Sequence, residues 1–156
     1  MSIPRRVLIT GSRGVLGRRV VEAIKHYHPT IEIVESQVDL TVRKEVERFL
    51  GSLPELDVVF HLAALVPIRE VNKDPTKAFS VNLGGTLNLL CGLQGRSSKV
   101  VFASSSHVYG AKKGPLSEND PLKPNSLYGE TKLIAENLIK SMGNSSSWDY
   151  LIARIF

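Results

Sequence analysis

Short apolar runs alternate with segments of helical periodicity along the whole chain, and this alternation constrains the fold more than any other feature. The apolar runs predict strands at residues 7–10, 31–34, 57–62, 99–103 and 149–156. Apolar residues three or four positions apart predict helices at residues 15–27, 41–50, 74–93 and 125–142. We expect Thr41 to cap the second of these helices, and Asn125 or Ser126 to cap the fourth. Strands joined by helices form parallel sheets with helices on both faces. The sequence therefore predicts one α/β domain, a doubly wound parallel sheet in three α/β/α layers.

The composition is that of an ordinary globular domain. The chain has 156 residues, of which 42% are hydrophobic and 22% charged, enough to bury a core without disulfides. The net charge of +5 predicts either a mildly basic surface or the attraction of an anionic ligand such as a nucleotide. No run of Lys and Arg is dense enough to predict a nucleic-acid partner.

Cysteine, histidine and apolar patterns exclude several other classes. The single cysteine, Cys91, allows no disulfide within the chain, and no His/Cys cluster has the spacing of a metal site. The apolar run after Arg6 is too short for a signal peptide, and no run is long enough to span a membrane. We therefore expect a cytoplasmic protein without a metal and without a membrane partner.

A loop with three glycines joins the first predicted strand to the first helix. Gly11, Gly14 and Gly17 have the spacing G-x-x-G-x-x-G. A tight turn in this setting lets backbone N–H groups at the helix start, those of Val15 and Leu16 included, face a pyrophosphate. A side chain at Gly11 or Gly14 is expected to obstruct the phosphates, and Gly17 to let the helix pack closely on the strand. The loop predicts a dinucleotide site, and its spacing resembles that of the extended short-chain dehydrogenase/reductase family.

Charged residues near this loop make opposite predictions about the cofactor. Glu35 follows the second predicted strand, where an acid binds the ribose diol of NAD, whereas Arg13 in the glycine loop can accommodate the 2′-phosphate of NADP. The choice between NAD and NADP stays open. The resemblance implies that Asp39 and Leu40 form the acid–apolar pair of the family, whose acid meets the adenine amino group. A turn or capping role is the alternative for Asp39.

A serine, a tyrosine and a lysine form the predicted catalytic group. Tyr128 and Lys132 lie four residues apart at the start of a predicted helix and share one face. An ammonium beside a phenol lowers the pKa of the phenol, so Tyr128 can exchange a proton with a substrate hydroxyl while a hydride moves to or from nicotinamide. Three serines, residues 104–106, follow the fourth strand, at the edge where open α/β sheets bind ligands.

The segment FASSSHVYG, residues 102–110, is similar to the S-S-x-x-V-Y-G segment of nucleotide-sugar epimerases. By this resemblance Ser105 takes the position of the catalytic serine. Sugar 4,6-dehydratases of the same family carry an acidic pair at the next two positions, where this chain has Ser106 and His107. The difference argues against dehydration and leaves epimerisation, reduction or oxidation. His107 is either a second proton donor or an ordinary loop histidine.

Two further segments extend the resemblance over residues 7–156 and imply a Rossmann-like fold. The segment HLAA, residues 61–64, is similar to the H-x-A-A segment of the family, where small residues leave room for the cofactor. The cofactor-lining positions that it implies here are Leu62, Ala63 and Ala64. The segment VNLGGT implies that Asn82 is a cofactor-side group.

The length departs from the family, whose members are roughly twice as long and carry a nucleotide-sugar pocket in their C-terminal half. We therefore expect residues 1–156 to be the NAD(P)-binding Rossmann domain of a longer enzyme, lacking the C-terminal substrate subdomain.

Three hypotheses about function follow. The first is an NAD- or NADP-dependent epimerase or reductase acting on a nucleotide-linked sugar, with Ser105, Tyr128 and Lys132 as its catalytic residues. The second is a cofactor-binding module without turnover, because the substrate half is missing. The third is a family dehydrogenase or reductase acting on a steroid-like or other carbonyl compound. A homodimer is one possible assembly.

Overall fold

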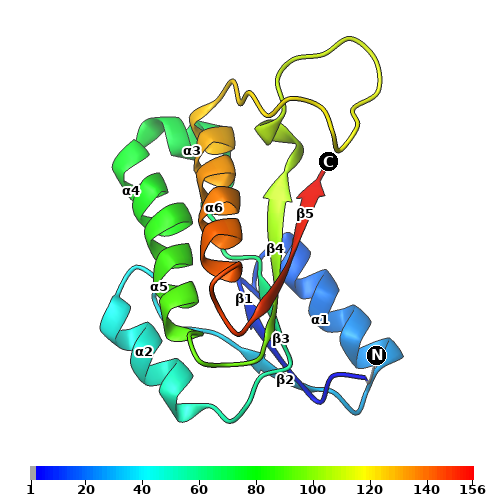
Figure 1. Cartoon of the computed structure of the whole chain (residues 1–156), viewed down its shortest axis with the longest axis vertical. Helices are drawn as coiled ribbons and strands as arrows, with labels where there is room; N and C mark the ends of the chain where they lie inside the picture. The colour runs from blue at the N-terminus through cyan, green and yellow to red at the C-terminus, as the bar shows by residue number, and fades with distance from the viewer. Residues whose placement is uncertain (1–2) are drawn as a thin grey trace.

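The computed structural model describes residues 3–156, which form a five-stranded sheet with helices on both sides (Figure 1). The strands are β1 (Arg6–Thr10), β2 (Glu32–Glu35), β3 (Val58–His61), β4 (Lys99–Ser105) and β5 (Asp149–Ile155). Their order in the sheet is β2-β1-β3-β4-β5, and every neighbouring pair is parallel. The predicted Rossmann-like α/β fold is confirmed.

The helices make the outer layers of the sandwich. Helix α1 (Val15–Tyr27) lies on one side of the sheet, and α2 (Arg43–Ser52), α5 (Gly85–Gly92) and α6 (Leu127–Gly143) lie on the other (Figure 1). The buried core between the sheet and these three helices contains Leu8, Val59, Val100 and Phe102 from the strands and Val46, Leu50, Leu89, Leu90, Ala135 and Ile139 from the helices. Because both faces of a parallel sheet are covered, its strands are apolar on both sides, which explains the continuous apolar runs.

The predicted helix at residues 74–93 is three elements in the structure. They are α4 (Pro75–Phe79), the π-helical turn η1 (Ser80–Gly84) and α5. Asp74 begins α4 by accepting a hydrogen bond of 2.9 Å from the Lys77 backbone N–H. A further short helix that we did not predict, α3 (Ile68–Lys73), precedes it and buries only Val71.

The two predicted helix caps have different outcomes. Ser126 caps α6, since its hydroxyl accepts a hydrogen bond of 3.1 Å from the Gly129 backbone N–H. Thr41 was expected to cap α2, and this prediction is wrong. Its hydroxyl donates instead to Asp39 at 2.7 Å, and α2 begins after Val42, which provides no side-chain cap. The competing partner is Asp39, two residues upstream, which draws Thr41 into a turn before the helix.

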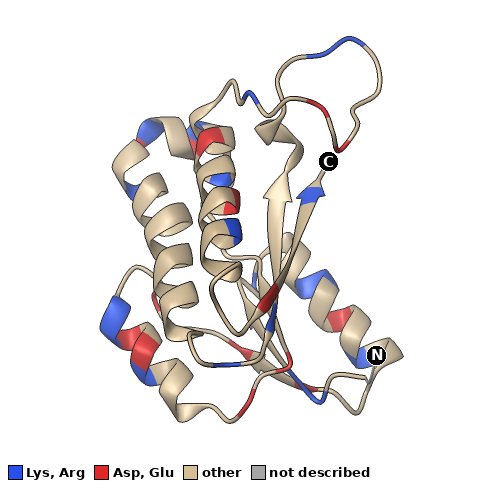
Figure 2. Cartoon of the chain, viewed as in Figure 1, with Lys and Arg blue, Asp and Glu red and all other residues tan. Residues whose placement is uncertain are grey.

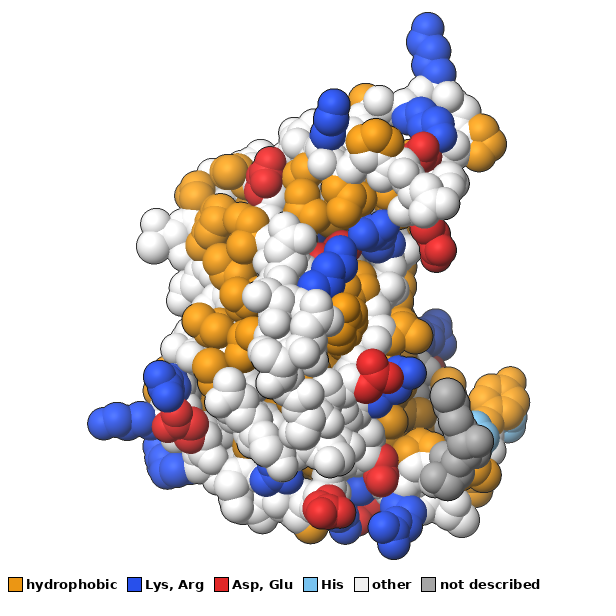
Figure 3. All heavy atoms as spheres, in the orientation of Figure 1, with side chains coloured by type: hydrophobic (Ala, Val, Ile, Leu, Met, Phe, Trp, Pro, Cys, Tyr) orange, Lys and Arg blue, Asp and Glu red, His pale blue; other side chains and the backbone are white. Residues whose placement is uncertain are grey.

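Surface charges are mixed. Positive and negative residues are interspersed along α2 and α6 (Figure 2). Hydrophobic side chains are also visible on the same face of the molecule (Figure 3), and Leu87 of α5 and Ile134 of α6 are 40% and 36% exposed. The mixture of charges on α2 and α6 means that the positive net charge of the chain is not concentrated on these two helices. Among the helices of residues 3–156, none is both long enough and apolar enough to cross a membrane.

Candidate active site

A cavity of about 1010 Å³ opens at the edge of the sheet where β1, β3 and β4 end. Most of the predicted site residues line it, namely Gly11, Gly14, Val15, Leu16, Gly17, Leu62, Ala63, Ala64, Ser105, Tyr128 and Lys132. The segment after β3, residues 65–68, completes the wall with apolar side chains that the sequence analysis did not single out. The topology therefore brings the glycine loop and the predicted catalytic residues into one cavity.

The glycine loop is packed against backbone at two of its glycines. Gly11 has a φ of +72°, and a Cβ there would lie 2.6 Å from the Ala63 backbone nitrogen. A Cβ at Gly17 would collide with the Gly11 carbonyl oxygen and lie 2.6 Å from the Ser12 Cα. We expected Gly11 to be a glycine because a side chain there would obstruct the phosphates. The structure corrects this reason, because a side chain at Gly11 would collide with the backbone of the segment after β3. Gly17 allows the helix to approach the loop itself.

The start of α1 has the features of an anion site. Gly14 is its N-cap residue and makes no side-chain cap, and the first turn contains no acidic residue. The N–H groups of a first helical turn have no partner within the helix, and the helix dipole favours a negative group beside them. Val15 and Leu16, whose N–H groups belong to this first turn, line the cavity. N–H groups in this position can bind a pyrophosphate.

The residues predicted to select the cofactor lie outside the cavity wall. The Arg13 guanidinium donates a hydrogen bond of 2.8 Å to the Gln37 side chain, and Glu35 is exposed at the end of β2. Their roles, and the choice between NAD and NADP, stay predictions. Asp39 accepts hydrogen bonds from the Thr41 hydroxyl and backbone N–H, which hold the pKa of Asp39 below its ordinary value. This is the turn role that we gave as the alternative.

Two more predicted cofactor residues, Leu40 and Asn82, make structural contacts, and their roles toward a cofactor stay predictions. Leu40 packs against the core, and its carbonyl accepts a hydrogen bond of 2.8 Å from Asn88. The Asn82 amide accepts from the Leu65 N–H at 2.6 Å and donates to the Leu65 carbonyl and the Thr131 hydroxyl, both at 3.1 Å. Asn82 therefore connects the segment after β3 to α6. It does not line the cavity itself, but it holds Leu65, which does.

His61, the histidine of the HLAA segment, is a neutral structural residue. Its Nδ1 lies 2.8 Å from the Thr10 hydroxyl, and its Nε2 lies 2.8 Å from the Thr86 hydroxyl. Because Thr86 donates its own proton to the Asn82 carbonyl, Nε2 must be the donor and Nδ1 the acceptor. Burial lowers the pKa of His61 to about 3, and the charge of Lys132 adds to the effect. The ring therefore stays neutral at physiological pH and fixes the end of β3.

The three predicted catalytic residues come from two adjacent elements. Ser105 is the last residue of β4, Tyr128 lies in the first turn of α6, and Lys132 follows one turn later. Gly129 permits this arrangement, because a Cβ there would collide with the His107 carbonyl oxygen. The start of α6 can therefore lie directly against the turn that follows β4.

The expected effect of Lys132 on Tyr128 is wrong for this structure. Burial raises the pKa of Tyr128, and the Ser105 side chain opposes this only in part. The Lys132 ammonium lies 4.1 Å above the Phe102 ring centroid, a cation–π contact. Burial lowers the pKa of Lys132 to about 7, against the opposing charge of Glu136. Lys132 is thus a buried cation that loses its proton far more easily than an ordinary lysine.

A buried ion pair behind Lys132 was missed by the sequence analysis. Glu136 is fully buried in α6 and receives hydrogen bonds from Arg154 of β5 at 2.9 and 2.8 Å and from the Ser104 hydroxyl at 2.6 Å. Burial works to raise the pKa of Glu136, but these hydrogen bonds outweigh it and keep that pKa below its ordinary value. One signal was available: Glu136 lies four residues after Lys132, on the same helix face.

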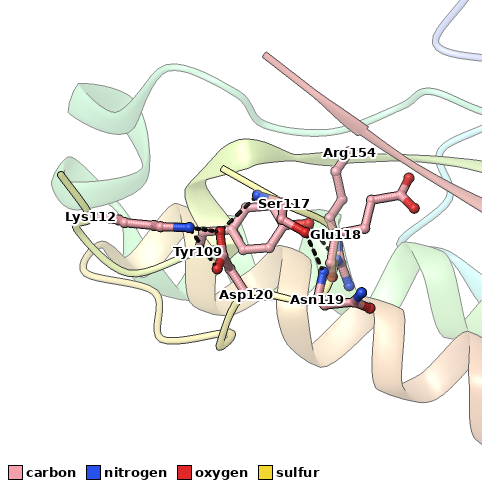
Figure 4. Close-up of polar contacts among 7 residues, drawn as sticks. All are labelled: Tyr109, Lys112, Ser117, Glu118, Asn119, Asp120 and Arg154. Carbon is pink, nitrogen blue, oxygen red and sulfur yellow. Dashed lines mark hydrogen bonds and ion pairs between the residues drawn. The ribbon is translucent and has the colours of Figure 1, made fainter. Parts of the chain in front are cut away.

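Arg154 also holds the long loop between β4 and α6 (Figure 4). Its Nη1 donates a hydrogen bond of 2.7 Å to the Tyr109 hydroxyl and one of 3.4 Å to the Glu118 carbonyl. Within the loop, Lys112 lies 2.6 Å from a carboxylate oxygen of Asp120, which also accepts from the Ser117 N–H at 2.7 Å (Figure 4). A single arginine thus connects the core of the site to the loop above it.

Comparisons with known proteins agree with this fold. Residues 7–156 match the model of the NAD dependent epimerase/dehydratase family. GDP-6-deoxy-D-mannose reductase of Pseudomonas aeruginosa is 31% identical over 97% of this chain and 52% of its own length. The UDP-glucose 4-epimerase of Thermus thermophilus in complex with NAD has a TM-score of 0.85 and 27% identity, over 96% of this chain and 54% of that one.

A second solved structure, RMD from Pseudomonas aeruginosa complexed with NADPH, has a TM-score of 0.86 and 30% identity, over 96% of this chain and 53% of that one. The chain thus spans about half the length of these relatives. The family match extends over nearly all of the described residues, including the glycine loop, Ser105, Tyr128 and Lys132. The chain belongs to the NAD dependent epimerase/dehydratase family.

Proposed function

We propose that the chain is the NAD(P)-binding half of an enzyme that epimerises or reduces a sugar carried on a nucleotide. One observation carries the proposal: a single cavity is lined by the glycine loop, the start of α1 and the three residues Ser105, Tyr128 and Lys132. Relatives of the same fold have been solved with NAD and with NADPH, and relatives are named as a sugar epimerase and a sugar reductase.

The cavity fits a dinucleotide. Backbone N–H groups at the start of α1 would be the donors for its phosphates, and Gly14 has no side chain to cover them. Ala63 and Ala64 present only small side chains to the cavity. When bound, the nicotinamide accepts or donates a hydride. The anionic phosphates would also favour the charged form of Lys132 and so raise its pKa.

Tyr128 and Ser105 would handle the proton that accompanies the hydride. Because burial raises the pKa of Tyr128, its phenol carries a proton at neutral pH. In reduction the phenol gives this proton to the substrate oxygen, and in oxidation the phenolate takes it back. Ser105 would hydrogen-bond the same oxygen and orient it.

One observation favours a second candidate, a cofactor-binding module without turnover. The chain spans about half the length of the relatives, so residues that contact the sugar in those proteins can lie in the other half. This candidate shares the cofactor cavity with the first and differs only in the reaction.

The first candidate predicts a reaction with a defined cofactor balance. The complete protein is incubated with UDP-, GDP- and dTDP-linked sugars and with NAD, NADP or their reduced forms. An epimerase inverts a sugar stereocentre without net change in reduced nicotinamide, whereas a reductase consumes one reduced nicotinamide for each product. Absorbance of reduced nicotinamide and chromatography of the sugars separate the two. Cofactor binding without conversion of any of these sugars would support the module and contradict the enzyme.

A further inference from the structure

His107 lies where two hollows of the molecule meet. It lines the large cavity together with Ser105 and Tyr128. It also lines a smaller hollow of about 240 Å³ beside Gly110, Leu116 and others of the loop before α6. The side chain is exposed, and its ring packs edge-on against the Tyr128 ring with centroids 5.7 Å apart. The proton transfer described above does not use this imidazole, although it contacts both residues that would perform it.

The Ser105 hydroxyl has two contacts with His107. The His107 backbone N–H donates to the Ser105 Oγ at 3.3 Å, and the imidazole Nδ1 lies 3.1 Å from the same oxygen. A hydroxyl has one proton to donate and two lone pairs that accept. The backbone N–H occupies one lone pair. The state of Nδ1 therefore decides whether the proton or the second lone pair of Ser105 remains for a substrate.

We propose that His107 is a positioning residue that sets the direction of the Ser105 hydroxyl, an inference that rests on the proposed function. With a proton on Nδ1, the imidazole donates to Ser105, whose own proton then points to a substrate carbonyl oxygen. With Nδ1 bare, Ser105 donates to the imidazole and has no proton left for the substrate oxygen. A carbonyl oxygen and a hydroxyl oxygen can both accept from Ser105, and a substrate hydroxyl keeps its own proton for Tyr128. A proton on Nδ1 is therefore what turns the Ser105 hydroxyl toward the substrate, and its shift to the other imidazole nitrogen turns the hydroxyl away.

The hydrogen bond itself can be tested in this chain, without substrate or turnover. Long-range ¹H–¹⁵N NMR spectra report the state of each imidazole nitrogen, and the signals lost in His107→Leu identify those of His107. Ser105→Ala is expected to shift the Nδ1 resonance of His107. Ser106→Ala, the neighbouring serine, is the matched control and is expected to leave it unchanged. An Nδ1 resonance that is indifferent to Ser105→Ala, or that responds equally to both variants, overturns the proposal.

The effect on catalysis is tested in the complete protein. His107→Leu is expected to lower kcat about tenfold, the effect of one lost hydrogen bond, without changing cofactor affinity. His107→Asn places an amide where Nδ1 was and is expected to restore most of the rate. His107→Gln places its amide near the Nε2 position instead and is not expected to restore the rate.

A double variant separates positioning from a general structural effect. In a Ser105→Ala background, His107→Leu is expected to cause no further loss of kcat, because the hydroxyl that it directs is gone. A full tenfold loss in that background, or equal losses in His107→Asn and His107→Leu, overturns the positioning role. If no nucleotide-linked sugar is converted, the proposed function fails, and the NMR comparison still decides the contact between Ser105 and His107.

Discussion

Tyr128→Phe is expected to lower the kcat of the complete protein by about 10²–10⁴-fold, the usual contribution of general acid–base catalysis. The substitution removes only the hydroxyl that would exchange a proton with the substrate. The ring would keep its buried packing against Val71 and Ala78, so the fold is preserved. Steady-state kinetics with saturating cofactor measures the loss, and a cofactor titration is expected to show nearly unchanged affinity.

Tyr27→Phe is the matched control, because that tyrosine is 72% exposed at the end of α1, and its loss is expected to leave kcat unchanged. Near-normal turnover in Tyr128→Phe would refute the role of the phenol. A loss of cofactor binding equal to the loss of rate would instead assign Tyr128 to binding rather than to proton transfer.

Glu136→Ala is expected to lower the free energy of unfolding by about 3–5 kcal/mol, because it leaves a partly buried cation without its partner. The Arg154 guanidinium makes two hydrogen bonds to the Glu136 carboxylate, and Ser104 makes a third. Urea unfolding at neutral pH measures the loss. Alanine is favourable in helices, so the change in helix propensity does not obscure it.

The control is a glutamate in an exposed pair of the same kind. Glu47 lies 2.6 Å from Arg43 on α2, with both side chains exposed, and Glu47→Ala is expected to cost about 0.5 kcal/mol or less. The contribution of Glu136 should also depend on pH. Because its pKa is lowered in the folded state, the contribution is present above the ordinary glutamate pKa and is lost as the pH falls below it. Equal losses in Glu136→Ala and Glu47→Ala would contradict the importance of burial.

Much of the fold could be predicted because parallel strands leave continuous apolar runs. Helix α1 was predicted with its observed bounds, and Ser126 was one of the two residues predicted to cap α6. The predicted helix at residues 74–93 is helical over residues 75–92, but the π-helical turn within it was not predicted. The turn η1 contains Asn82, whose amide contacts Leu65 and Thr131. Contacts between residues distant in sequence cannot be predicted from local periodicity.

The site also has features that the sequence predicts and features that depend on tertiary contacts. Spacing along the chain was sufficient to place Tyr128 beside Ser105, because strand ends and helix starts meet at one edge of the sheet. The direction of the pKa shift of Tyr128 was not predictable, since it depends on burial by residues distant in sequence. The pair of Glu136 and Arg154 joins residues from a helix and a strand, and the sequence gives no distance between them.

Thermal unfolding of this chain with and without NAD(H) or NADP(H) tests most directly whether the cavity holds a nicotinamide dinucleotide. A ligand that binds only the native state adds about 2.7 kcal/mol at one hundred times its Kd, so the melting temperature should rise with at least one cofactor. Gly14→Val fills the approach to the start of α1 and should abolish the rise. Gly51→Val, at a glycine with open space around it, should keep the rise. A folded wild-type chain that shows no rise with any of the four forms, or an undiminished rise in Gly14→Val, would contradict the assignment of the cavity to a dinucleotide.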